Sequence, residues 1–171
     1  DSYMIRYNGS AWAKEEIGTS KPLYGIWGLD ASNIFAVGAS GTVVRYNGSA
    51  WSSSQEGIAD LHDVWGSSSA NVFAVGRAGA ILRYNGSSWA ASTGPTGEDL
   101  HGIWGSSASN IFVVGAAGVI LRYDGSNWTQ MIRRVRENLD DIWGNSSSNV
   151  FAVGSPRLDG GNRYYTILRW N

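Results

Sequence analysis

The sequence contains no cysteine, so its 171 residues can build neither a disulfide framework nor a thiolate metal site. Charged residues are few, and 13 basic against 14 acidic side chains give a net charge of −1. Without a cationic surplus there is no electrostatic signature for nucleic acid or for an anionic membrane surface. The sequence also lacks an apolar run of about 18 residues, which a bilayer-spanning helix needs. We therefore expect neither a nucleic-acid partner nor membrane insertion.

Glycine and tryptophan, by contrast, are abundant, with 23 and 9 copies. Many glycines, many aromatics and few charges are typical of short strands joined by tight turns. Four tryptophans recur about every 39 residues, which is close to the period of a propeller blade. They are Trp27, Trp65, Trp104 and Trp143, and each lies in a copy of the same segment. The chain is therefore an internal repeat.

Each repeat is predicted to contain four strands. In the second complete copy these cover Leu61–Gly66, Asn71–Gly76, Ala80–Tyr84 and a segment that carries Trp89. No segment has a convincing helical period. One such sheet has two apolar faces that its neighbours must cover, so the blades are expected to stack around a common axis. The predicted fold is an all-β propeller of four-stranded antiparallel blades, with a solenoid of hairpins as the alternative.

The third and fourth strands of each repeat are expected to form a hairpin. The Asn85-Gly86 dipeptide predicts a two-residue type I′ turn, because both residues tolerate positive φ. That turn places Tyr84 opposite Ser87 and Leu82 opposite Trp89. Leu82, Tyr84 and Trp89 then share one face of the blade.

The chain is predicted to be one domain of about four blades plus one extra strand. The first residues repeat only the second half of the unit, and the last copy stops after its third strand. Three arrangements follow: a ring that closes imperfectly, a segment of a larger ring, or blades completed by a second copy. Exposed strand edges invite association, so self-association is an expected interaction. The blade boundaries are 1–22 (half blade), 23–60, 61–99, 100–138 and 139–171 (incomplete).

The repeat pattern IWGSSxxNVFAVGxxGxILRYNGSxW resembles the tryptophan-rich propeller repeats of large secreted bacterial proteins. It is more loosely similar to sialidase-type, lectin and photosystem-assembly-factor-type propellers. The resemblance covers nearly the whole chain, and it implies the propeller fold and an extracellular or cell-envelope location. Residues 1–10 lack the cationic and apolar pattern of a signal peptide and start within a repeat, so a signal lost from the mature chain stays open.

The two histidines occupy the same position in successive repeats. No HxH or HExxH spacing joins His62 or His101 to further ligands, so we expect no metal site and no cofactor. Tyr24 and Asp140 hold the matching positions in the other repeats. The expected place of all four is near the central channel of the ring.

Pairs of carboxylates, which glycoside hydrolysis needs, also recur at one place in the repeat. Because an acid and a base need different environments, repeated positions favour solvated or turn-capping carboxylates over catalytic ones. The sialidase resemblance fails in detail as well, since arginine occurs once per repeat and not as a converging trio. We expect a non-enzymatic protein with no catalytic residue. The pairs are Asp60/Asp63, Glu98/Asp99 and Asp140/Asp141.

One arginine lies in the third strand of every repeat, on the face opposite the Tyr/Trp cluster. There it is expected to tie its blade to a carboxylate or a backbone carbonyl of the neighbouring blade, with ligand contact as the alternative. These residues are Arg6, Arg45, Arg83, Arg122 and Arg169.

Tryptophan is the most informative functional feature. One set lies in the first strands, and a second set (Trp12, Trp51, Trp89 and Trp128) follows the hairpins. Large aromatic rings can fill the wedge between blades, or their faces can stack on sugar rings. Weak sugar sites repeated around a ring would gain strength through multivalency. The candidate ligand-binding residues are Trp27, Trp65, Trp104, Trp143, His62, His101, Ser67, Ser107 and Asn145.

The predicted function is a non-enzymatic binding propeller, with glycans as the first ligand class and one weak, lectin-like site per repeat. One alternative is a scaffold for protein–protein interaction without a small ligand. The other is a duplicated or designed repeat protein of no specific function.

Overall fold

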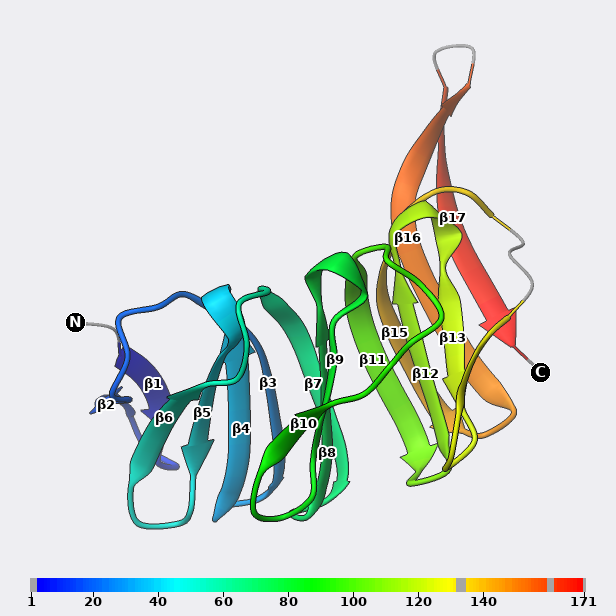
Figure 1. Cartoon of the computed structure of the whole chain (residues 1–171). Coiled ribbons are helices and arrows are strands. Elements are labelled where there is room, and N and C mark those ends of the chain that lie inside the picture. The colour runs from blue at the N-terminus through cyan, green and yellow to red at the C-terminus, as the bar shows by residue number, and fades with distance from the viewer. Residues whose placement is uncertain (1–2, 132–134, 160–161, 171) are drawn as a thin grey trace.

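Five antiparallel sheets, one for each copy or part-copy of the repeat, stand side by side in an arc (Figure 1). The computed structural model describes residues 3–131, 135–159 and 162–170. The N-terminal half-blade consists of β1 (Tyr3–Tyr7) and β2 (Trp12–Glu16). Three complete blades follow, and the chain ends in the three-stranded blade IV.

Within every sheet the strands pair in chain order. Blade I consists of β3 (Leu23–Asp30), β4 (Asn33–Gly38), β5 (Thr42–Tyr46) and β6 (Trp51–Gln55). Blade II consists of β7 (Leu61–Ser68), β8 (Asn71–Gly76), β9 (Ile81–Tyr84) and β10 (Trp89–Ala91). Blade III consists of β11 (Leu100–Ser107), β12 (Asn110–Gly115), β13 (Ile120–Tyr123) and β14 (Trp128–Gln130). Blade IV consists of β15 (Leu139–Ser146), β16 (Asn149–Asp159) and β17 (Asn162–Trp170).

The second strand of each complete blade is buried on both faces. Phe35 and Ala36 of β4 are adjacent, so their side chains point to opposite faces, yet both are almost fully buried. Phe73 and Ala74 of β8 repeat this. Neighbouring first strands (β3, β7, β11, β15) contact one another along one side of the arc. The blades therefore stack face to face around a common side, and the predicted all-β propeller architecture is correct.

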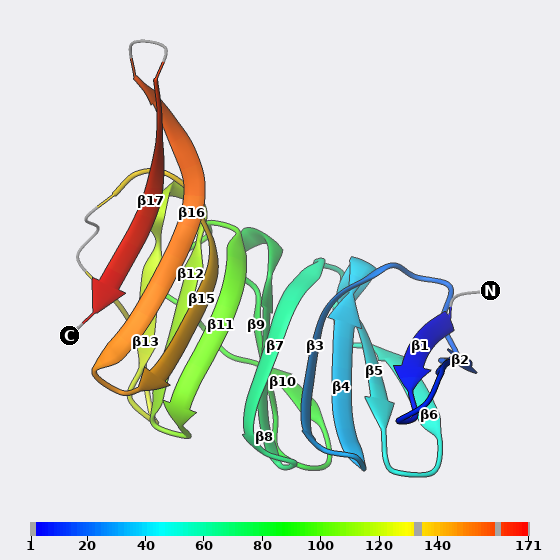
Figure 2. The same cartoon turned by 180° about the vertical axis from the view of Figure 1, so that it is seen from behind.

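The two ends of the chain lie at opposite ends of the arc in both views (Figures 1 and 2). The half-blade and blade IV form separate sheets, with no strand of one paired to a strand of the other in the described part of the chain. The chain therefore does not close a ring on itself, and imperfect closure is excluded. A larger ring and completion by a second copy stay open.

The predicted two-residue hairpin turn is wrong. Trp89 pairs with Tyr84, and Leu82 pairs with Ala91, so four residues form the loop. The Asn85 side chain explains the longer loop, because its Oδ1 accepts the backbone N–H groups of the residues two and three positions on, at 2.9 and 3.0 Å. Of the dipeptide only Gly86 has positive φ (101°). The predicted face survives, because Trp89 opposite Tyr84 still shares a face with Leu82.

Short 3₁₀ turns join the second and third strands of the complete blades: Ala39–Gly41, Arg77–Gly79 and Ala116–Gly118. Their middle residues are left-handed, with φ of 55°, 55° and 52°. The N–H of Ala78 in blade II donates to Asp99 Oδ1, just before blade III, at 2.8 Å. Ser40 donates to Asp60 at 2.8 Å in the same way. These carboxylates cap turns across a blade junction, as predicted.

Candidate functional site

The junction between blades I and II is an aromatic cluster tied by one arginine. Phe35 of blade I lies 5.5 Å from the ring of Tyr84 and 6.1 Å, edge-on at 81°, from the ring of Trp89, both in blade II. Arg45 places its guanidinium 5.4 Å from the Phe35 ring. Its Nη1 donates to the Tyr84 hydroxyl at 2.7 Å, and that hydroxyl donates to the Gly86 carbonyl at 2.7 Å.

The junction between blades II and III repeats this arrangement. Phe73 lies 5.4 Å from Tyr123 and 5.9 Å, at 82°, from Trp128. Arg83 Nη1 donates to the Tyr123 hydroxyl at 3.3 Å. The arginine therefore ties neighbouring blades as predicted, but its acceptor is a tyrosine hydroxyl and not a carboxylate or a backbone carbonyl.

In the described residues, the junction between blades III and IV has no counterpart of Trp89 or Trp128. Phe112 holds the position of Phe35 and Phe73, but blade IV contains only three strands, and β17 is its outer strand in the described residues. A cavity of about 370 Å³ lies at this junction. It therefore lies where the Trp89 or Trp128 ring packs at the two preceding junctions.

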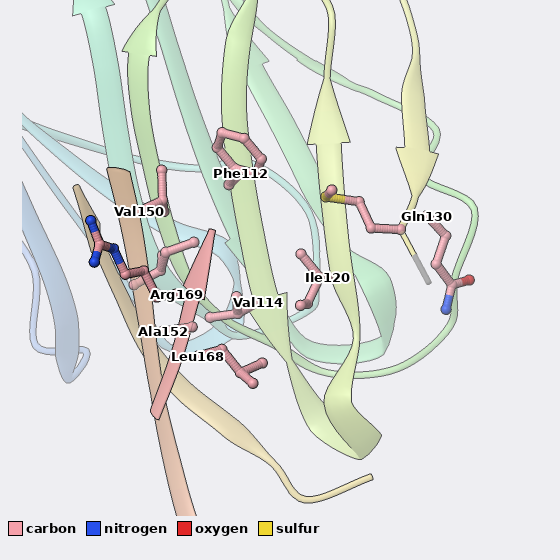
Figure 3. A pocket seen from close by; sticks show the side chains of 10 residues that line it. Phe112, Val114, Ile120, Gln130, Val150, Ala152, Leu168 and Arg169 are labelled. Carbon is pink, nitrogen blue, oxygen red and sulfur yellow. The ribbon is translucent and has the colours of Figure 1, made fainter. Parts of the chain in front are cut away.

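The cavity walls are almost entirely apolar. In Figure 3, Phe112 and Val114 of β12 and Ile120 of β13 face Ala152 of β16 and Leu168 of β17. Gln130 of β14 lies at one side, and the guanidinium of Arg169 points away from the apolar cluster. An apolar wall beside an unpaired strand edge can take an aromatic side chain together with the backbone that carries it.

The first-strand tryptophans mostly fill the blade junctions. The Trp27 ring lies against Gly66 of the next blade, where an added Cβ would be 2.7 Å from Cη2 of the ring. Trp65 on Gly105 and Trp104 on Gly144 repeat this contact at 2.7 and 2.8 Å. No sheet of the described residues covers Trp143 of blade IV, and this side chain is 60% exposed. Of the four predicted sugar-stacking rings, Trp143 is mostly exposed, and the other three are partly buried against the next blade.

Both histidines lie at register shifts near the start of a first strand, where one extra residue is left unpaired. His62 Nδ1 is 2.8 Å from the Leu100 carbonyl oxygen, and His101 Nδ1 is 2.9 Å from that of Leu139. Because a carbonyl only accepts, each Nδ1 carries the proton. Each histidine therefore ties its blade to the first strand of the next blade.

The side chains at the histidine position of successive blades lie in a row along the side of the arc where the first strands contact one another. The rings of Tyr24 and His62 lie 6.3 Å apart, and those of His62 and His101 lie 5.9 Å apart. His101 Nδ1 is 3.9 Å from a carboxylate oxygen of Asp140. The described residues contain no group of three or more His, Cys, Asp or Glu side chains that could hold a metal ion.

The polar loop residues of the predicted sugar site are bonded locally. Ser67 Oγ accepts the side-chain N–H of Asn71 at 2.8 Å, and Asn145 Oδ1 accepts that of Asn149 at 2.8 Å. Ser107 Oγ is 3.4 Å from a backbone N–H in its own loop. These residues end the first strands, whereas the histidines begin them, about 16 Å away along the strand. The predicted ligand-binding residues are thus not brought together at one site.

Among the carboxyl groups of the described residues, Asp63 has the strongly raised pKa. Burial raises its pKa to about 6, although two backbone N–H groups favour the ionised form. Its Oδ1 accepts the N–H of Val64 at 2.8 Å, and its Oδ2 accepts that of Ile103 in blade III at 2.9 Å. Asp63 thus ties blade II to blade III through backbone amides.

Stacked antiparallel blades, with an aromatic cluster at the junctions of blades I and II and of blades II and III, define the fold as that of a β-propeller. Solved structures of YCF48 are similar to this chain. One, of YCF48 bound to D1 peptide, has a TM-score of 0.70 and 15% identity, covering 96% of this chain and 58% of that one. Another, of YCF48 from Cyanidioschyzon merolae, has a TM-score of 0.65 and 14% identity, covering 86% and 50%. The chain thus spans about half the length of these structures, and the likeness is one of fold.

No protein-family model matches the sequence, and no curated protein matches it. In the described residues no helix is long and apolar enough to cross a bilayer.

Proposed function

We propose that the chain is a non-enzymatic interaction module that binds an extended peptide segment along the outer edge of β17, with an aromatic side chain in the cavity beside Phe112. The observation that carries this proposal is the apolar cavity at the junction where a tryptophan packs in the two preceding junctions. Strand addition explains the binding mode, because an unpaired edge supplies backbone hydrogen bonds and a pocket reads alternate side chains.

The sequence of β17 resembles that of the third strands in the complete blades, each of which pairs with a fourth strand that carries a tryptophan. Its segment Ile167-Leu-Arg-Trp170 differs at one residue from the β9 segment Ile81-Leu-Arg-Tyr84, which pairs with the strand carrying Trp89. A similar structure holds YCF48 with a D1 peptide, so a propeller of this shape can take a peptide ligand. The partner expected here is a protein with an exposed extended segment that contains Trp, Tyr or Phe.

A peptide copied from residues 85–92 tests this proposal. It contains the loop and the strand that carries Trp89, and calorimetry against the whole chain should detect one binding site. Alanine in place of the tryptophan should weaken binding about tenfold or more, the usual cost of truncating a buried aromatic anchor.

A matched pair of protein variants locates the site. Ala152→Leu extends a cavity-wall side chain that is 5% exposed, and should abolish binding. Ala91→Leu makes the same change on the exposed side of β10 and should leave binding unchanged. Equal binding by both variants, or no preference for the tryptophan peptide, would exclude the cavity as a peptide site.

A second candidate, glycan binding, is favoured by one observation, the 60% exposure of the Trp143 ring. An exposed indole face suits the apolar face of a sugar ring. Sugar titration should then quench tryptophan fluorescence in the wild type and leave Trp143→Ala unaffected. No response to a panel of oligosaccharides would exclude it. An extracellular or cell-envelope location belongs to this proposal and can be checked by fractionating the producing cells.

A further inference from the structure

The outer face of blade IV carries one half of a blade junction. Strand alternation puts Phe151 on the face opposite Ala152, which lines the cavity, so Phe151 points away from blade III. Arg169 pairs directly opposite Phe151 and holds its guanidinium 5.7 Å from the ring. Arg45 and Phe35 have the same relation, at 5.4 Å.

Apolar residues on this face are exposed, whereas their counterparts at an internal junction are buried. Ile167 is 69% exposed, but its counterpart Ile81 at the junction of blades II and III is 2% exposed. Val153 is 45% exposed, and its counterpart Val75 is fully buried. The face has the composition of an internal junction and lacks only its cover.

The outer face of the half-blade carries the residues that complete such a junction from the opposite side. Tyr7 and Trp12 stack with ring centroids 5.5 Å apart, as Tyr84 and Trp89 do at 5.3 Å. The Tyr7 hydroxyl donates to its own turn at 2.8 Å, like the Tyr84 hydroxyl. Tyr7 is 52% and Trp12 is 67% exposed, whereas Tyr84 is 5% exposed.

We propose that copies of this chain associate head to tail, with Phe151 and Arg169 of one copy packed against Tyr7 and Trp12 of the next. The new contact repeats the internal junction: Phe against Tyr and Trp rings, and an arginine donating to the tyrosine hydroxyl. Because the two faces differ, the contact is heterologous and forms a closed ring if the rotation between copies allows it.

The contact uses the outer face of blade IV, while the peptide cavity lies on the face toward blade III. Of the residues that line the cavity, only Arg169 takes part in both. Loss of either interaction therefore leaves the other measurable.

Two arginine substitutions, one on each face, test the association. Trp12→Arg and Ile167→Arg change side chains that are exposed in a single copy, so each variant should keep the wild-type circular dichroism spectrum. Light scattering should give a multimer for the wild type and a single-chain mass for each variant. Ile58→Arg, at a loop residue that is 92% exposed, should keep the wild-type mass.

Mixing the two variants supplies the decisive measurement. Each retains one intact face, so a head-to-tail contact predicts a dimer of one Trp12→Arg and one Ile167→Arg chain in the mixture. A single-chain mass for the wild type overturns the proposal, and so does a multimer that survives both substitutions. A mixture that stays at the single-chain mass overturns the head-to-tail geometry.

Discussion

The indole of Trp65 lies directly on Gly105 of the next blade, so that a Cβ at this glycine would be 2.7, 2.8 and 2.9 Å from three ring atoms. Gly105 has no Cβ, and the ring occupies that space. The same pair recurs at the neighbouring junctions. The distance between neighbouring blades along their first strands is therefore set by the contact of a tryptophan ring on one blade with a glycine on the next.

Gly105→Ala should destabilise the chain by about 1–3 kcal/mol, because the added methyl would overlap the indole ring of Trp65. The free energy of unfolding in urea measures this. Gly97→Ala is the matched control, since an added Cβ there meets nothing within 4 Å. It should change stability by less than about 0.5 kcal/mol. Equal effects of the two substitutions would contradict the tryptophan-on-glycine contact.

Tyr84→Phe should cost about 1–3 kcal/mol, because it removes the acceptor of the 2.7 Å bond from Arg45. The Nε atom of the same guanidinium is buried and has no hydrogen-bond partner among the described residues, so the arginine cannot easily find another acceptor. Tyr46→Phe removes the counterpart hydroxyl, which accepts at 3.4 Å from the exposed Arg6. The urea midpoint of Tyr46→Phe should match that of the wild type. A larger loss of stability in Tyr46→Phe than in Tyr84→Phe would refute the role of the buried Arg45–Tyr84 hydrogen bond.

Stability should fall as the pH rises through the pKa of Asp63. The folded chain holds this proton up to about pH 6, whereas an unfolded aspartate releases it near 3.8, so the unfolded state binds fewer protons in between. Above about pH 6, burial of the ionised Asp63 therefore lowers the free energy of unfolding by up to about 3 kcal/mol. Below about pH 4 the group is protonated in both states, and this cost is absent.

Asp63→Asn removes this titration, and urea unfolding between pH 4 and 7 should show a flatter dependence than the wild type. Glu98→Gln, at an exposed carboxyl, should keep the wild-type slope. Stability of the wild type that rises over this range by more than that of Asp63→Asn would mean that Asp63 is not destabilised by burial.

The repeat itself made the strands and their stacking predictable. Seventeen strands follow from the copies of one motif, and the apolar Phe-Ala-Val segments identify the strand covered on both sides. The loop between Tyr84 and Trp89 was not predictable from its dipeptide. Asn-Gly suits a two-residue turn, but the Asn85 side chain accepts two backbone N–H groups and thereby stabilises the longer loop.

The candidate site was less visible in the sequence. Histidine and serine in one strand looked like parts of one site, yet His62 and Ser67 sit at opposite ends of β7 and bond to backbone or neighbouring side chains. The cavity at Phe112 has no motif of its own, because it lies beside β17, which has no further partner strand in the described residues.

A disulfide-trapping measurement tests most directly whether β17 accepts a fourth strand in register. Arg83 pairs with Ala90 in blade II, and Arg169 holds the place of Arg83 in blade IV. The chain has no cysteine of its own, so Arg169→Cys carries a single thiol. With oxidised glutathione as the electron acceptor, it should form a disulfide with the 85–92 peptide that carries cysteine in place of Ala90. The account predicts this product for Arg169→Cys and not for Ser52→Cys on the edge strand β6, and equal yields from the two positions would contradict it.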